Sequence, residues 1–269
     1  MNVPAVSVVL PAYNCEKYIA KAIESVLHQT FTDFEFIIIN DGSTDRTEEI
    51  IKSFSDPRIL YQVNNTNKGL VYTLNKGIDI ARGKYIARMD GDDIALPERF
   101  KKQFDHLQQN KEIDILATVV TLIDENENVS GTWHSDINIV SAKDIRNELP
   151  KDNCIAHPTV MGKTEIFRRF KFNQTQSIGE DYDLWLRMAA DNIIIHKLPE
   201  PLLQHRILQG SFTRTRQQNV FWKKAKIKMR FSWQQFRKPK LNAFIIKTFL
   251  YGCGDLLKGI GKNIKNLFR

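Results

Sequence analysis

Short apolar runs and helical patterns alternate along the first hundred residues of the chain. Runs rich in Val, Ile, Phe and Tyr predict strands over residues 6–10, 34–39, 59–63 and 85–89. Apolar residues at helical spacing predict helices between them, over 16–29, 43–54 and 70–81. Strands and helices in this order form a mostly parallel central sheet flanked by helices, so we expect an α/β fold.

Beyond residue 93 the pattern is less regular. It predicts helices over 97–109, 141–149 and 180–190, strands over 113–120 and 193–198, and a surface loop or hairpin tip at 125–128. Two basic helices are expected at about 214–237 and 241–268, separated by Lys238-Pro239-Lys240. We therefore divide the chain into an α/β domain, residues 1–213, and a basic amphipathic helical tail, residues 214–269.

The predicted sheet places four polar loops at one edge. Ligands of open α/β sheets bind beyond the carboxyl ends of the strands. The loops that follow the four strands there span residues 11–14, 40–43, 64–69 and 90–93. Polar residues that are scattered along the first hundred positions are therefore expected to converge in space.

The last of these loops holds three carboxylates within four residues, Asp90, Asp92 and Asp93. Like charges at this spacing raise one another's pKa values unless a cation joins them, and oxygen ligands suit Mg²⁺ or Mn²⁺. A solvated acidic turn is the alternative. An EF-hand calcium loop is excluded, because Lys101 and Gln103 occupy the twelfth positions, where that loop needs a glutamate.

Composition narrows the class of protein. Three cysteines lie far apart without a CxxC pair, which argues against a disulfide scaffold or a zinc knuckle and favours a reducing, cytoplasmic setting. The first seven residues lack the basic start and apolar core of a signal peptide. No run approaches the roughly eighteen apolar residues of a membrane span.

Charge is unevenly distributed along the chain. The whole chain carries +8, but residues 214–269 hold fifteen Lys or Arg and a single acid, Asp255, so this tail carries +14 and the rest of the chain −6. Because Phe and Trp residues are interleaved with these charges, the tail could bind acidic lipid or nucleic acid. A solvated helical face is the alternative.

Glycine-rich phosphate loops are absent from this sequence. Residues 11–15 contain no glycine, so the first loop is no dinucleotide fingerprint. Gly162-Lys163-Thr164 resembles the end of a P-loop, but His157 stands where that motif needs its earlier glycine. A nucleoside diphosphate bound at this acidic edge would therefore need a metal to offset its charge.

Several polar residues could act on a ligand at this edge. Tyr13 could stack on a nucleobase and Asp41 could accept hydrogen bonds from a base or a ribose, although a packed tyrosine and an Asp-Gly turn are simpler interpretations. Gly179-Glu180-Asp181 opens a predicted helix, where acids either cap the helix or present a general base to a hydroxyl. His157 and His205-Arg206 are weaker candidates.

Four ordered motifs resemble those of family 2 glycosyltransferases with the GT-A fold. They are residues 6–14 (VSVVLPAYN), residues 39–45 (INDGSTD), the acidic cluster at 90–93 followed by Pro97, and Gly179-Glu180-Asp181. The resemblance covers about residues 5–213, so the domain at 1–213 would be a GT-A nucleotide-diphospho-sugar transferase domain with a basic helical extension. It implies a nucleotide-sugar donor, a divalent metal (Mn²⁺ or Mg²⁺) on the donor diphosphate, and inversion at the anomeric carbon.

The resemblance also implies roles for individual residues. The nucleoside would be held by four residues after the first two strands, Pro11, Ala12, Tyr13 and Asp41. Asp90 would contact the ribose or the base. Asp92 would be the principal metal ligand, and Asp93 could take that role instead. Asp181 would be the general base, with Glu180 beside it, and His157 would lie near the acceptor.

Two departures from the family pattern bear on function. Many members carry Arg-Asn in the third helix where this chain has Leu74-Asn75, and Arg88 could supply the missing donor contact. The Gln-x-x-Arg-Trp signature of processive synthases is absent, because Ile207 and Leu208 follow Gln204-His205-Arg206. We therefore expect an enzyme that adds single sugars.

The favoured hypothesis is a hexosyl- or N-acetylhexosaminyltransferase that acts on a glycan or lipid-linked glycan precursor of the cell surface. Its basic tail would dock on anionic lipid, which places the enzyme in the cytoplasm at the inner face of the cell membrane. One alternative is a nucleotidyltransferase, although residues 11–15 lack the basic, glycine-rich loop that such enzymes use. Another is a non-catalytic lipid or nucleic-acid binder acting through the tail, which leaves the acidic motifs unexplained; nucleic acid is the disfavoured partner.

Overall fold

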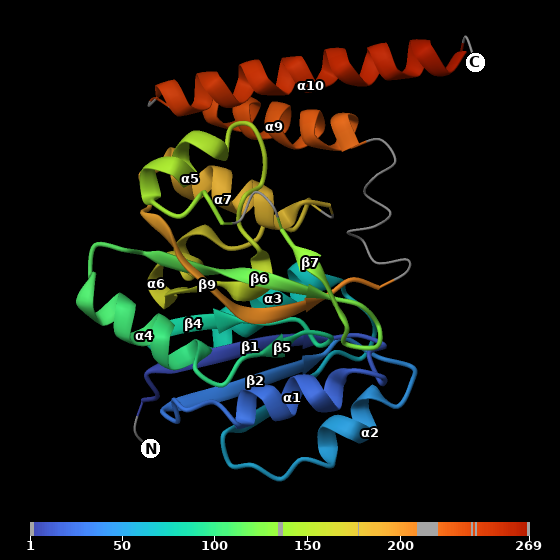
Figure 1. The fold of residues 1–269 in the computed structure, drawn as a ribbon, viewed down its shortest axis with the longest axis vertical. Helices are drawn as coiled ribbons and strands as arrows, with labels where there is room; N and C mark the ends of the chain where they lie inside the picture. The colour runs from blue at the N-terminus through green and yellow to red at the C-terminus, as the bar shows by residue number, and fades with distance from the viewer. Residues whose placement is uncertain are drawn as a thin grey trace.

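One nine-stranded sheet organises the residues that the computed structural model describes, which are 3–133, 137–176, 178–208, 220–237, 239 and 241–267. The strand order is β3-β2-β1-β4-β8-β6-β9-β5, and β7 pairs with β6. Helices lie on both faces of the sheet, and the two C-terminal helices lie at the end of the molecule farthest from the N-terminus (Figure 1).

The first four strands form the parallel part of the sheet. They are β1 (Val6–Ala12), β2 (Phe34–Asn40), β3 (Ile59–Val63) and β4 (Tyr85–Arg88). The register of β1 begins with Val6 opposite both Phe34 and Tyr85, so these three strands start level with one another. Every residue of β1, β2 and β4 is buried, which accounts for their continuous apolar runs. The four predicted strands and their parallel arrangement are confirmed.

Alternate residues of the strands feed two separate cores. Val8 and Leu10 point to the face covered by α1 (Ile19–Leu27), α2 (Thr47–Lys52) and α4 (Arg99–Gln109). Val9 points to the other face, which is covered by α3 (Leu70–Ile80), α6 (Thr164–Phe170) and α7 (Glu180–Ala190). The predicted sheet with helices on both faces is confirmed.

The second half of the sheet mixes strand directions. β8 (Met161–Lys163) runs antiparallel to β4 and to β6 (Ile115–Ile123), and β6 forms a hairpin with β7 (Val129–Thr132) around the expected tip. α5 (Ala142–Glu148) and a 3-10 turn, η1 (His157–Thr159), lie between β7 and β8. β5 (Ile94–Ala95) and β8 escaped the sequence prediction, because segments of two or three residues carry no periodicity.

Strand β9 (Ile195–Arg206) is longer than predicted. The sequence pattern ended at residue 198 because Pro199 and Pro201 normally interrupt a strand. The structure accommodates both prolines in register shifts, since Leu198 pairs with Thr118 and Pro201 already pairs with Val119. The strand then continues beside β6 and pairs antiparallel with β5, and this extension brings residues 203–206 to the edge where the polar loops meet.

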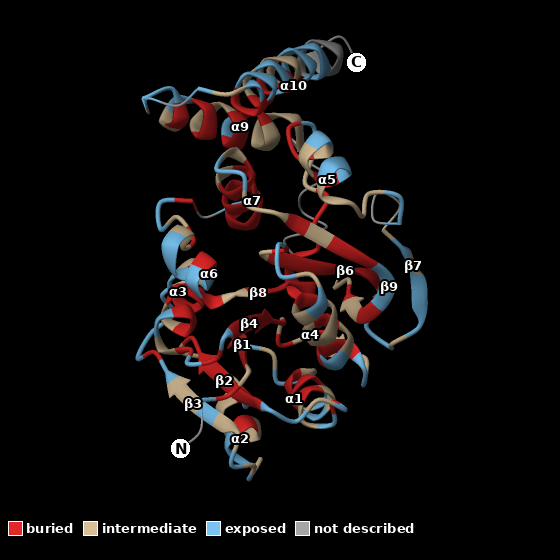
Figure 2. Ribbon diagram, turned by 90° about the vertical axis from the view of Figure 1, so that its left-hand side faces the viewer, coloured by how far each residue is buried: buried red, intermediate tan, exposed pale blue. Residues whose placement is uncertain are grey.

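The C-terminal helices α9 (Val220–Phe236) and α10 (Ala243–Leu267) pack against each other and against α7 (Figure 2). Phe231, Phe244 and Ile245 belong to the same core cluster as Trp185 of α7. The predicted boundary at 213/214 lies outside the described residues, as do Lys238 and Lys240, so the division into two units stays a prediction. None of the helices in the described part of the chain is both long and apolar enough to cross a membrane.

Replacing Phe231 by alanine is expected to lower the free energy of unfolding by about 3–5 kcal/mol, because the ring is fully buried in this shared core. The measurement is denaturation by urea or guanidinium. Trp233→Ala on the same helix is the matched control: its side chain is 63% exposed, and the expected change is under about 0.5 kcal/mol. Equal losses at the two positions would contradict the packing of α9 into the core.

Candidate active site

The polar loops meet at the carboxyl edge of the parallel strands, as the sequence predicts. A cavity of about 710 Å³ there is lined by Pro11, Ala12 and Tyr13 after β1, by Asp41 after β2 and by Asp90 after β4. Residues 67–73, Gln174 and Glu180 complete its wall. The structure thus brings together all five residues that the resemblance assigns to the nucleotide-sugar donor.

Asp41 shapes the wall of this cavity from inside the protein. Its buried carboxylate accepts hydrogen bonds from Asn64 Nδ2 (2.8 Å), Lys68 N (2.9 Å) and Gly69 N (2.8 Å), so it holds the loop after β3 against the loop after β2. Gly42 beside it has a φ of +70°, and a Cβ there would lie 2.6 Å from the carbonyl carbon of Thr66, so a larger residue does not fit. Tyr13, by contrast, is half exposed at the rim, with its ring accessible to a ligand.

The three carboxylates of the acidic cluster have different partners. One oxygen from each lies within 4.8 Å of the others. Asp90 forms a bidentate ion pair with the buried Arg88. Asp93 is fully buried and accepts hydrogen bonds from Arg206 N (2.9 Å) and from His205 Nδ1 (3.0 Å). Asp92 accepts no side-chain hydrogen bond from the described residues, and burial together with Asp93 and Asp90 raises its pKa to about 7.

Two residues of the β9 extension contact this acidic cluster. Burial lowers the pKa of His205, but the adjacent Asp93 and then Asp90 and Asp92 outweigh it and raise that pKa to about 9. The fully buried Arg206 donates from Nε to the carbonyl oxygen of Asp92 (2.9 Å). From the sequence this His-Arg pair is a weak candidate, since a lone histidine is usually structural and an arginine often pairs with a surface acid.

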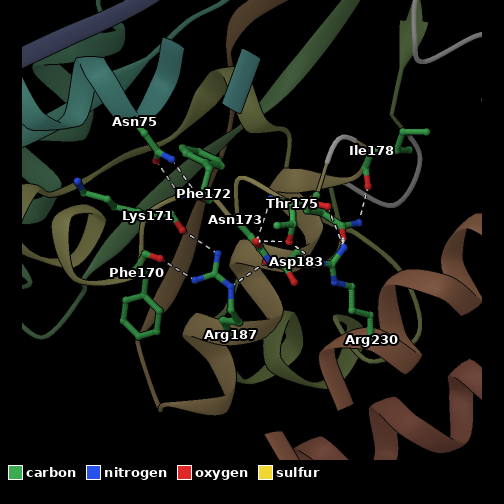
Figure 3. Close-up of polar contacts among 11 residues, drawn as sticks. Asn75, Phe170, Lys171, Phe172, Asn173, Thr175, Ile178, Asp183, Arg187 and Arg230 are labelled. Atoms are coloured by element: carbon green, nitrogen blue, oxygen red, sulfur yellow. Dashed lines mark hydrogen bonds and ion pairs between the residues drawn. The ribbon is translucent and has the colours of Figure 1, made fainter. Parts of the chain in front are cut away.

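The positions of Leu74, Asn75 and Arg88 bear on the expected donor contacts. Leu74 is buried in the core. Asn75 exchanges hydrogen bonds with the backbone of Phe172 (2.9 Å each way), so its side chain also faces the protein interior (Figure 3). Arg88, the suggested substitute for the missing arginine, lines the neighbouring cavity, but its guanidinium is engaged by Asp90. A donor contact by Arg88 would therefore have to be shared with that carboxylate.

Asp181 lies in a second cavity of about 550 Å³, which borders the first through Leu70, Asp90 and Glu180. Its Oδ2 accepts a hydrogen bond from Asn153 Nδ2 (2.8 Å), whereas its Oδ1 is buried without a hydrogen-bond partner among the described residues. A carboxylate held by one oxygen with the other unsatisfied is suited to take a proton. Asn153 was not anticipated, because a single asparagine in a loop carries no pattern.

Glu180 and Asp181 occupy the first helical turn of α7, as predicted. Gly179 precedes them with a left-handed φ of +68°, and a Cβ there would lie 2.4 Å from Cδ1 of Ile227 on α9. The glycine therefore lets α9 approach the start of the helix that carries both acids. His157 lines the same cavity and packs against the rings of Phe172 (5.2 Å between centroids) and Trp185 (5.9 Å).

Comparison with known proteins decides the family. The model of glycosyl transferase family 2 matches residues 7–173, which include the first three polar loops and the acidic cluster. The chain belongs to glycosyl transferase family 2. This glycosyltransferase is 35% identical over 257 residues to an uncharacterised glycosyltransferase of Methanocaldococcus jannaschii, a match that covers 93% of this chain and 87% of the relative.

Two further similarities extend the comparison. The glycosyltransferase is 34% identical over 206 residues to WbnJ, an O-antigen biosynthesis glycosyltransferase of Escherichia coli, covering 75% of this chain and 79% of WbnJ. Its fold matches the crystal structure of Staphylococcus aureus TarS 1–349 in complex with UDP-GlcNAc, with a TM-score of 0.75 over 93% of this chain and 72% of that chain. At 19% identity this likeness shows the GT-A fold alone.

Proposed function

We propose that this glycosyltransferase moves a hexosyl or N-acetylhexosaminyl group from a nucleoside diphosphate sugar to a hydroxyl of a glycan or lipid-linked glycan precursor. The observation that carries the proposal is the pair of adjacent cavities that share Asp90 and Glu180. One, the nucleoside cavity, holds the candidate nucleoside residues. The other, the acceptor-side cavity, holds Asp181 with its unsatisfied oxygen. A donor lying across the shared wall would present its sugar to an acceptor beside Asp181.

The setting we propose is cell-surface polysaccharide synthesis. WbnJ is named for O-antigen biosynthesis, and TarS was solved with a nucleotide sugar, UDP-GlcNAc. In the proposed complex, Pro11, Ala12 and Tyr13 enclose the nucleobase, with the Tyr13 ring stacked on it. Asp41 has three of its acceptor sites filled by the protein, which leaves one for a base or ribose group, and Asp90 faces the ribose.

The acidic cluster fits a divalent cation, Mn²⁺ or Mg²⁺. Three oxygen donors converge there, and burial together with the neighbouring carboxylates raises the pKa of Asp92, an effect that a bound cation would offset. Asp93 is already bound to Arg206 N and His205, so we assign Asp92 as the principal ligand and Asp93 as a second one. When bound, the cation would supply charge stabilisation to the departing diphosphate.

Asp181 is the proposed general base. Asn153 fixes Oδ2, so Oδ1 is the atom that would accept the proton of the attacking hydroxyl. The acceptor oxygen forms a bond to the anomeric carbon from the face opposite the diphosphate, and the bond from that carbon to the diphosphate oxygen breaks. The nucleoside diphosphate leaves, and a single displacement of this kind inverts the anomeric centre.

The charge of the second cavity favours an uncharged acceptor group. Its carboxylates are Asp90, Asp92, Asp152, Glu180 and Asp181. Its basic residues are bound to acids or carbonyls of the protein: Arg88 to Asp90, His205 to Asp93 and Arg206 to the Asp92 carbonyl. A phosphate would have to compete with these acids and carbonyls for a basic partner, whereas a sugar hydroxyl beside Glu180 and His157 would not. Trp133 and Ile207 add an apolar side suited to the face of a sugar ring.

The rival functions fit the site less well. A nucleotidyltransferase would need basic donors for a triphosphate, and the loop at 11–15 supplies none. A non-catalytic binder acting through the tail gives no role to the unsatisfied Asp181 oxygen. We infer a non-processive enzyme because the Gln-x-x-Arg-Trp signature is absent. Gln204 of this chain instead pairs with Ile94 in the sheet.

We also propose peripheral binding to the anionic inner face of the cell membrane, through the outer side of α10. At 100° per residue an exposed apolar stripe spans about 80° of this helix; its members are Ile246, Leu250, Leu257 and Ile260. Exposed lysines flank it on one side, Lys247, Lys258 and Lys262. The single acid of the tail, Asp255, pairs with the buried Lys228, so the outer side stays positive and disfavours self-association.

Asp92→Asn is expected to abolish the stabilisation of the folded protein that the nucleotide sugar gives in the presence of Mn²⁺. In a thermal-shift screen of nucleotide sugars with Mn²⁺, the wild type should be stabilised by about 2.7 kcal/mol at a hundred times the dissociation constant, and EDTA should remove the effect. Asp105→Asn, at a half-exposed acid on α4, should behave as the wild type. Stabilisation that survives both EDTA and Asp92→Asn would refute the assignment of the metal ligand.

Asp181→Asn is expected to reduce sugar transfer by about 10²–10⁴-fold, because the amide cannot accept the proton. Donor affinity should remain within about twofold, since Asp181 lines the acceptor-side cavity and not the nucleoside cavity. Release of nucleoside diphosphate and calorimetric donor binding are the two measurements. Asp191→Asn, an exposed acid at the end of the same helix, is the control, and full activity of Asp181→Asn would exclude it as the base.

Leu250→Glu combined with Leu257→Glu is expected to abolish sedimentation with phosphatidylglycerol vesicles, because it places two charges in the proposed apolar contact. Val129→Glu, at a 67% exposed position on β7, should leave sedimentation unchanged. Phosphatidylcholine vesicles should bind weakly, since each lysine contributes about 1 kcal/mol only at an anionic surface. Undiminished binding of the double variant would exclude α10 as the membrane contact.

A further inference from the structure

The loop between α6 and α7 borders the first of the two cavities. Gln174 in this loop lines the nucleoside cavity, and the loop ends at Gly179, directly before Glu180 and Asp181. Of its described residues, Gln174, Thr175 and Ile178 are exposed, while Phe172, Gln176 and Gly179 are buried. The position of Gln174 therefore depends on how the residues on either side of it are held.

The first part of the loop is held by the body of the protein. Asn75 of α3 binds both the amide and the carbonyl of Phe172 (Figure 3). Arg187 of α7 donates to the carbonyl oxygens of Phe170 and Lys171 (2.7 Å each) while its Nε binds Asp183 (2.8 Å). These contacts fix the chain as far as Phe172, two residues before Gln174.

The part that follows Gln174 is contacted from the C-terminal helix α9 by Arg230. Its guanidinium donates to the carbonyl oxygen of Thr175 (2.9 Å), to Oε1 of Gln176 (3.1 Å) and to the hydroxyl of Thr175 (Figure 3). Gln176 in turn donates to the carbonyl oxygen of Ile178 (2.7 Å). One turn earlier on α9, Ile227 lies against Gly179.

Arg230 contacts the loop through hydrogen bonds of its guanidinium. All three acceptors are neutral oxygens, so no ion pair explains the contact, and a planar guanidinium with several donors is needed to reach them together. Within the loop, Oδ1 of Asn173 accepts from the amide (3.2 Å) and hydroxyl (2.8 Å) of Thr175. Gln174 thus sits at the tip of a turn whose far end is fixed by Arg230.

We propose that Arg230 is a positioning residue for donor binding: from α9 it holds the loop at Thr175 and Gln176 so that Gln174 faces the nucleoside cavity. The basic helix that precedes the proposed membrane-binding α10 is then also part of the apparatus that shapes the donor site. This inference rests on the proposed function, because it takes the ligand of that cavity to be a nucleoside diphosphate sugar.

The test is the affinity of the full-length protein for UDP, or for GDP if UDP does not bind, with Mn²⁺ in isothermal titration calorimetry. Arg230→Ala is expected to weaken binding about tenfold, the effect of one or two lost hydrogen bonds. Arg230→Lys should lie between the wild type and Arg230→Ala, since an ammonium cannot reach all three acceptors. Lys226→Ala, an exposed cation on the same helix, should bind as the wild type does.

A double-mutant cycle separates positioning from general stability. If Arg230 acts through Gln174, then Arg230→Ala in a Gln174→Ala background should weaken binding no further. The proposal would be overturned if the losses of affinity from the two substitutions multiply. It would also be overturned by an Arg230→Ala variant that binds within twofold of the wild type. If Arg230→Ala fails to fold, Thr175→Ala removes one contact without touching α9, and unchanged affinity in it and in Arg230→Lys would overturn the proposal equally. A wild type that binds neither nucleotide would overturn the proposed donor itself.

Discussion

Three carboxylates can stand within four residues after β4 because basic groups from two strands stand beside them. Arg88 at the end of β4 pairs with Asp90, and the ring of His205 and the amide of Arg206 hold Asp93. Asp92 is left with its acceptor capacity and a pKa of about 7. The site therefore depends on the pairing of β5 with β9, which brings together residues 112 positions apart in sequence.

The parallel half of the fold and the residues at its edge were predictable from the sequence. Strands buried on both faces leave continuous runs such as that of β2, and amphipathic helices between them fix a parallel order. The carboxyl ends then meet at one edge, so Tyr13, Asp41 and Asp90 could be placed together before their contacts were known. This part is local, because each element carries its own pattern and parallel strands are joined by right-handed crossovers.

The parts of the fold and site that the sequence did not predict depend on contacts that leave no local pattern. β9 continues through Pro199 and Pro201 because β6 tolerates register shifts, and without that extension His205 would not reach Asp93. Asn153 orients Asp181, and Arg230 ties the loop beside Gln174, each through a single side chain whose partner no sequence pattern indicates. A charge count indicated a basic tail, but which cations face solvent and which face the site is decided by tertiary packing.

The central claim is that one acidic edge binds a nucleoside diphosphate sugar and that Asp181 drives its single displacement. The most direct measurement is ¹H and ³¹P NMR of a reaction with an α-linked nucleotide sugar and a glycan acceptor. The account predicts release of nucleoside diphosphate and a β-linked product. A product with retained anomeric configuration, or release of pyrophosphate in place of nucleoside diphosphate, would contradict it.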